Sequence, residues 1–117
     1  MLGRRLDAAL APLGLSAQQF SALAFLNGYG SASISDVAAF LGADRTTVTR
    51  NMSLLEKRQL VERAPDADGR IRAMRLSPQG DELFARALPL WREVQAAALA
   101  RVTGLDPSTL LESLRRL

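Results

Sequence analysis

The clearest alternation of apolar and polar positions lies in residues 44–60, and the spacing predicts one helix with two unlike faces. Val48, Met52 and Leu55 recur at helical spacing and would face a core. Short hydroxyls and guanidinium groups make the opposite side polar, and such a side can enter the major groove of a duplex. An ordinary amphipathic surface helix shows the same pattern, so the neighbouring segments must decide. The candidate groove-facing residues are Arg45, Thr46, Thr47, Thr49, Arg50 and Ser53.

Residues 33–43 lie just before the 44–60 helix. They predict another short helix, joined to the 44–60 helix by a tight turn. Ser33 and Asp36 have the spacing of a capping box, with Asp in the usual place of Glu or Gln. Gly42 can end this helix in a left-handed conformation, and Asp44 can cap the next one. Two helices around a short glycine-bearing turn, with a polar outer face on the second, predict a helix-turn-helix.

The segment that follows predicts a β-hairpin, which after a helix-turn-helix would be a wing. Residues 61–63 lead into a turn rich in Pro, Asp and Gly at 65–69, and residues 70–76 then alternate in polarity. Arg70 would lie at the tip, where its guanidinium could enter a narrow minor groove with Asp68 orienting it. A solvated turn pair without function is the alternative. Further along the wing, phosphate contacts are expected from Arg72 and Arg75.

The rest of the chain predicts helices at both ends. A short helix spans residues 1–13. Another helix begins at Ala17 and ends around residues 28–30. A short extra strand near residues 33–34 could follow it. Ser77 and Pro78 begin a long helix that runs to about Val102, with a kink expected at Pro89. A last helix begins at residues 106–107. The predicted order is mainly α with a small β wing, α-α-α-α-β-β-α-α.

The first and last helices carry more apolar surface than one small winged helix can cover, which favours a partner chain over packing within the chain. We therefore expect a homodimer, with residues 1–14 and 78–117 as dimerisation helices and residues 15–77 as the winged helix of a single domain. The candidate interface residues are Leu2, Leu6, Leu10, Leu110, Leu111, Leu114 and Leu117.

The amino-acid composition excludes several kinds of functional site and indicates the kind of partner. The chain has no Cys and no His, so we expect no disulfide, no thiol switch and no metal site built on Cys or His. An enzyme that uses carboxylates or a Ser–Lys pair is the remaining alternative. The acids lie at predicted surface or capping positions, the single Lys is not near a glycine-flanked Ser, and no glycine-rich nucleotide motif is present, so we expect no enzymatic activity and no cofactor. No apolar run approaches the roughly 20 residues that span a bilayer and no signal peptide is visible, so a cytoplasmic protein without membrane contact is expected. The net charge of +3 arises entirely between residues 41 and 75. That placement favours a polyanion partner such as double-stranded DNA.

Four aromatic residues could line a cavity for a small aromatic ligand: Phe20, Tyr29, Phe84 and Trp91. Aromatic residues at helical spacing more often pack in a core, and core packing is the favoured interpretation.

An ordered set of short motifs resembles the MarR family of bacterial transcriptional regulators over residues 6–117. The set comprises Ser33-x-x-Asp36-Val37-Ala38-x-x-Leu41-Gly42, Asp44-Arg45-Thr46-Thr47-Val48-Thr49-Arg50, Asp66-x-Asp68-x-Arg70 and Leu76-Ser77-x-x-Gly80. The resemblance implies a dimeric winged helix-turn-helix protein that binds DNA, often under the control of a small ligand. In that family the first helix is usually longer than it is here.

The function expected from these observations is a homodimeric transcriptional regulator, a repressor, that binds a pseudo-palindromic operator and is released by a small ligand. The alternative is a winged helix used only for protein–protein contacts. Charge placement argues against that alternative, because a protein-binding winged helix has no need of a basic reading face.

Overall fold

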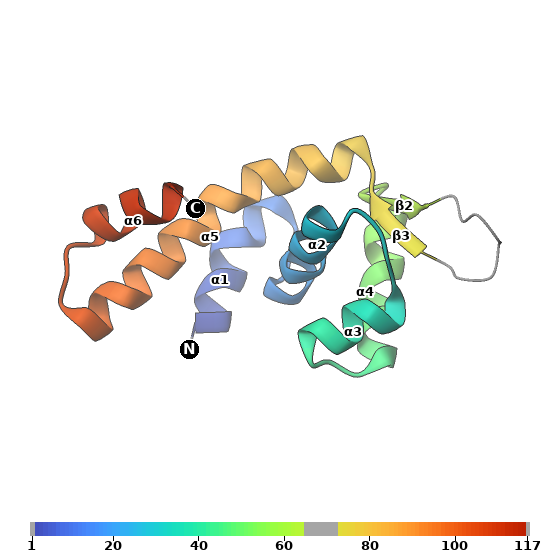
Figure 1. Ribbon diagram of the computed structural model, residues 1–117, viewed down its shortest axis with the longest axis horizontal. Helices are drawn as coiled ribbons and strands as arrows, with labels where there is room; N and C mark the ends of the chain where they lie inside the picture. Colours follow the sequence, from blue (N-terminus) through green and yellow to red (C-terminus); the bar gives the residue numbers. More distant parts are fainter. Residues whose placement is uncertain (1, 65–72, 117) are drawn as a thin grey trace. The chain divides into compact units, whose positions relative to one another are not determined.

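The computed structural model describes residues 2–64 and 73–116, which form helices and a small antiparallel sheet (Figure 1). This is the mainly α fold with a β wing that the sequence predicts, including the extra strand before the helix-turn-helix. The elements in chain order are α1 (Leu2–Leu10), the 3₁₀ turn η1 (Ala11–Leu13), α2 (Ala17–Tyr29), β1 (Ala32–Ser33), α3 (Ile34–Leu41), α4 (Arg45–Lys57), β2 (Val61–Arg63), β3 (Ala73–Leu76), α5 (Pro78–Thr103) and α6 (Pro107–Arg115).

The chain divides into two compact units. Residues 18–84 form the winged-helix unit, and residues 1–17 with 85–117 form the terminal unit. The winged-helix unit therefore includes the start of α5, which the sequence assigned to the dimerisation helices. The reason is packing, since Phe84 on α5 stacks on Phe20 of α2 with ring centroids 5.4 Å apart.

The sheet of the winged-helix unit has three strands in the order β1-β3-β2, all antiparallel. Its central strand, β3, pairs Met74 with Ala32 on one side and with Arg63 on the other. The short β1 is added at the edge because the chain passes along β3 just before Ser33 caps α3. Met74 and Val61 are buried and join the sheet to the helical core.

The core of this unit is built from buried side chains of its helices, and α2 contributes them from more than one face. Its most buried side chains come from α2, α3 and α4 and include Leu23, Leu26, Val37, Val48 and Leu55. Full burial of each such side chain contributes roughly 1.5–3 kcal/mol. The predicted buried face of residues 44–60 is confirmed, since Val48, Met52 and Leu55 are all at most 2% exposed.

The helix-turn-helix begins and ends where its capping residues predict. Ser33 and Asp36 form the capping box, each side chain accepting the other's backbone N–H. Gly42 ends α3 at a φ of 62°. The prediction that α4 reaches Leu60 is wrong, because the helix ends at Lys57 and Gln59 turns the chain at a φ of 62°.

In the terminal unit, the side chain of Asp7 holds the start of α2 by accepting the Ala17 N–H at 2.6 Å. Helix α5 runs through Pro89 as one element, and Gly104 follows its end with a φ of 73°. The kink expected at Pro89 stays a prediction. Asp106 caps α6, as its sequence predicts.

Within the described residues no single helix is long and apolar enough to cross a membrane, although the bent pair Arg4–Leu13 and Ala17–Tyr29 meets that test jointly by length and composition.

Candidate nucleic-acid interface

Helix α4 presents the polar face that the sequence predicted, and it does so because its opposite face is buried. Arg45, Thr46, Thr49, Arg50 and Ser53 are all exposed. Their side chains project from a helix whose orientation is set by buried neighbours, so the face is held ready to meet a partner. Arginine and short hydroxyl groups on such a face can form hydrogen bonds to base edges and to phosphates.

Thr47 differs from the other five candidates because the helix cap uses it. Its backbone N–H donates to Oδ1 of Asp44 at 2.6 Å, and the residue is half-buried. The backbone and side-chain hydrogen bonds from Thr47 lower the pKa of the Asp44 carboxyl below its usual 3.8, and the nearby positive charge of Arg50 adds to this shift. Asp44 thus stays ionised at neutral pH and stabilises the N-terminus of α4.

An amide cluster that sequence reasoning missed fixes the middle of α4 to the start of α2. Nδ2 of Asn51 donates to the Gln18 side chain at 3.1 Å, and the Asn51 side-chain oxygen accepts from Nε2 of Gln19 at 3.5 Å. The available signal was the presence of three amides in helices expected to pack together. These contacts hold α4 against α2.

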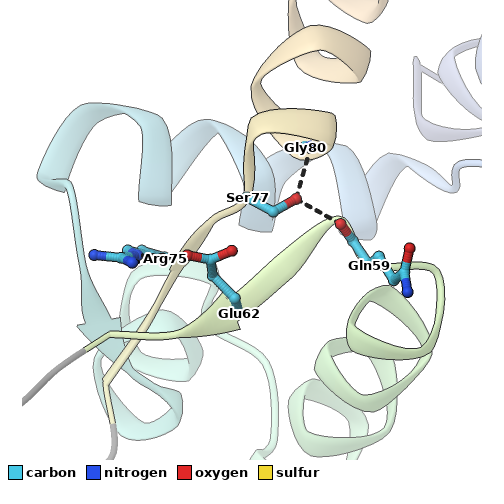
Figure 2. A network of polar contacts seen from close by, with 5 residues as sticks. All are labelled: Gln59, Glu62, Arg75, Ser77 and Gly80. Carbon is cyan, nitrogen blue, oxygen red and sulfur yellow. Dashed lines mark hydrogen bonds and ion pairs between the residues drawn. The ribbon is translucent and has the colours of Figure 1, made fainter.

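Ser77 fixes the other end of α4, as Figure 2 shows. Its hydroxyl donates to the carbonyl of Gln59 and accepts the Gly80 N–H at 3.0 Å, while its own N–H donates to the carbonyl of Leu60 at 3.0 Å. Ser77 is only 3% exposed. The residue therefore caps α5, as predicted, and also ties α5 to the turn that follows α4.

Gly80 explains the second half of the Leu-Ser-x-x-Gly motif. A Cβ at this position would lie 1.9 Å from the backbone oxygen of Leu60, far inside any allowed contact. Only glycine lets the first turn of α5 approach the Leu60 backbone closely enough for Ser77 to bond to both carbonyls.

The wing is described only at its base. There Arg75 forms an ion pair with Glu62 across β2 and β3, with Nη2 at 2.8 Å from Oε2 (Figure 2). Arg63 lies 3.9 Å from the carboxylate of Glu56. Arg75 is thus already paired with an acid before any phosphate approaches. The other predicted wing residues, Asp68, Arg70 and Arg72, lie outside the described residues.

The four aromatic residues considered for a ligand cavity differ in burial and belong to both compact units. Phe20 and Phe84 stack inside the core, 4% and 8% exposed, which is the favoured packing interpretation. Tyr29 is 74% exposed at the end of α2, and Trp91 belongs to the terminal unit. An open hollow beside Tyr29 is lined instead by residues that the sequence did not single out, among them Phe25 and Phe40.

The candidate interface residues of the terminal unit fall into two groups. Leu6 and Leu10 are 6% and 0% exposed within the single chain, so they have almost no surface left for a partner. Leu110, Leu111 and Leu114 on α6 remain half-exposed, and no residue of Pro107–Arg115 is buried. The side chain of Leu2 and the whole of Leu117 lie outside the described residues.

The fold has well-defined structural relatives. The MosR transcriptional regulator of M. tuberculosis, in a crystal structure with DNA, is 34% identical, with a TM-score of 0.74 over 98% of this chain and 88% of that one. MarR from E. coli, in a mutant form with operator DNA, is 23% identical, with a TM-score of 0.77 over 98% and 83% of the two chains. YusO from Bacillus subtilis is 22% identical, with a TM-score of 0.71 over 97% and 79%.

Comparison with known sequences and family models identifies the family of this chain. A comparison with curated protein sequences gives no significant match. The MarR family model, however, matches residues 13–71, which include α2, the helix-turn-helix and β2. Together with the identity to MosR over nearly the whole chain, this match shows that the protein belongs to the MarR family of transcriptional regulators.

Proposed function

We propose that this transcriptional regulator binds a specific duplex sequence through α4 and acts as a homodimeric repressor on a pseudo-palindromic operator in the cytoplasm. The observation that carries the proposal is the exposed hydroxyl and guanidinium face of α4, set opposite a fully buried face. The DNA in the crystal structure of the related MosR supports a duplex as the partner. Arg45, Thr46, Thr49, Arg50 and Ser53 would enter the major groove, with Thr47 closer to the cap.

Selection of bound sequences from random duplex DNA tests this proposal directly. We expect an enriched sequence with two-fold symmetry and half-sites about one helical turn, roughly 34–36 Å, apart. We also expect affinity to fall steeply with salt, because phosphate contacts release counterions. A protein-binding winged helix would enrich no sequence and would show little retention on duplex DNA, which would refute the proposal.

The wing contributes a minor-groove contact in this proposal. Arg70, oriented by Asp68, would reach the groove beside each half-site, and Arg72 and Arg75 would contact phosphate. Support comes from the motif spacing and from the β2–β3 pairing that leads into the wing. Arg70→Ala should weaken operator binding strongly and leave the circular dichroism spectrum unchanged. An unchanged affinity in a gel-shift titration would remove the wing from the proposal.

Dimerisation would be mediated by the terminal unit. Support comes from its uncovered apolar side chains, with Val102 at 86% and Leu105 at 55% exposure, together with the half-exposed leucines of α6. Burial of a patch of this kind is a common driving force for self-association. Analytical ultracentrifugation should find a dimer for the natural protein and a monomer for Leu111→Glu. Leu54→Glu, which places the same charge at an exposed leucine of the other unit, should remain dimeric.

Release by a small ligand is part of the proposal because the family resemblance implies it. The core packing of Phe20 and Phe84 gives no support to a cavity between them. Titration of the operator complex with aromatic acids such as benzoate tests this part, and an unchanged affinity for DNA would remove it without affecting the DNA-binding proposal.

A further inference from the structure

An open hollow of about 450 Å³ lies on the winged-helix unit where α2, β1 and α3 meet, and no residue of α4 lines it. A volume of this size lies within the range of small-molecule sites in proteins. Three of its seven lining residues are aromatic. The full lining is Phe25, Tyr29, Ser31, Ala32, Asp36, Ala39 and Phe40.

The three rings of the hollow form one cluster. Phe25 is buried and lies between the other two, with ring centroids 4.6 Å from Tyr29 and 4.5 Å from Phe40. Tyr29 and Phe40 are 74% and 61% exposed. Two large aromatic side chains thus present their surfaces to solvent at the same place, where a ligand could cover them.

The hollow is lined by a single charged residue, Asp36. Asp36 is the only charged residue between Ala8 and Ala43, and it lies in the lining. One oxygen of its carboxylate accepts the Ser33 N–H at 3.3 Å, and the residue remains exposed. The lining contains no basic side chain, so an anionic ligand would meet a negative charge with no cation to offset it.

We propose that this hollow binds a small organic cation, an ammonium compound that carries an apolar or aromatic group. The electron-rich faces of Tyr29 and Phe40 attract a cation, and the Asp36 carboxylate supplies the opposite charge. The apolar part of the ligand would cover the exposed rings. This site shares only Tyr29 with the aromatic set considered from the sequence, and it does not depend on DNA binding.

Fluorine NMR on protein labelled with 3-fluorotyrosine provides a direct test, because Tyr29 is the only tyrosine of the chain. The probe is phenyltrimethylammonium, compared with neutral benzyl alcohol and anionic benzoate. We expect saturable movement of the single resonance by the cation, at a concentration about tenfold lower than either comparison compound requires. A resonance that does not move, or that benzoate moves equally well, would overturn the proposal.

Three variants separate the contributions of the aromatic rings and of the Asp36 carboxylate to binding of the cation. Phe40→Leu keeps an apolar side chain without a π face and should weaken binding of the cation about fivefold. Asp36→Asn keeps an acceptor for the Ser33 N–H and should weaken it about threefold. Asp81→Asn removes an exposed carboxylate from the first turn of α5, outside the lining, and should change nothing. Unchanged binding in Phe40→Leu would show that the rings are not the recognition element and would refute the proposal.

Discussion

Replacing Gly80 by alanine would force a methyl group against the backbone that follows α4. The added Cβ would lie 1.9 Å from the Leu60 oxygen, whereas real Cβ contacts essentially never fall below 3.0 Å. The first turn of α5 and the Leu60 backbone would therefore have to separate by about 1 Å. Both partners are main-chain atoms, so no flexible side chain can move aside.

The loss in the free energy of unfolding caused by that separation can be estimated. Overpacking of this kind costs about 1–3 kcal/mol. The displaced Leu60 carbonyl also stretches its 3.0 Å hydrogen bond from the Ser77 N–H, and losing that bond would add about 1 kcal/mol. The gain in helix propensity from glycine to alanine returns about 1 kcal/mol. We expect a net loss of roughly 1–3 kcal/mol, which would lower the melting temperature by about 4–12 °C in a domain of this size.

Thermal denaturation followed by circular dichroism measures this loss, at one protein concentration because the proposed dimerisation would shift the apparent stability. Gly28→Ala is the matched control, since Gly28 lies in α2 with no atom within 4 Å of an added Cβ. This control should raise stability by roughly 0.5–1 kcal/mol. If Gly80→Ala proved as stable as the natural protein, the close approach of α5 to Leu60 would be refuted.

The remaining predictions concern α4 and the base of the wing. Arg50→Ala should reduce operator affinity by about 1–3 kcal/mol if the guanidinium contacts guanine, and an equal loss on random DNA would assign it to phosphate instead. Glu62→Gln should free Arg75 from its 2.8 Å ion pair and tighten binding to any duplex about threefold, with a salt slope steeper by about one; fluorescence anisotropy that finds no change would exclude a phosphate contact by Arg75. Because its lowered pKa means that Asp44 binds its proton less readily in the folded state, its contribution to stability should be present at neutral pH and lost as the pH falls below about 4. Asp44→Ala should remove this acid-sensitive part of the melting curve, and an identical pH profile in the variant would contradict the assignment.

The sequence predicts the helix-turn-helix well because its determinants are local. The Ser33–Asp36 capping box, Gly42 and Asp44 act within three or four residues of themselves, so spacing alone locates the ends of α3 and the start of α4. The end of α4 is harder to predict. Gln59 takes a left-handed conformation usually adopted by glycine, and nothing in its side chain signals that choice.

Contacts between distant segments could not be read from the sequence. Asn51 meets Gln18 only because α2 and α4 cross at that point, and Ser77 reaches the Gln59 carbonyl only after the turn has formed. The pairing of Phe25 with Phe40 likewise depends on how α2 and α3 pack. Periodicity predicts which face is apolar, but it does not give the residue that each side chain meets.

Apart from Thr47, the residues that support α4 differ from those proposed to read DNA. The buried stripe, the Asp44 cap, the Asn51 amides and the Ser77 junction do not use the side chains of Arg45 or Thr46. If α4 reads DNA as proposed, descendants of this gene could exchange Arg45 or Thr46 and acquire new operators while the scaffold keeps its stability. Such an arrangement would make the proposed reading surface an interchangeable part, open to rapid divergence and to deliberate redesign.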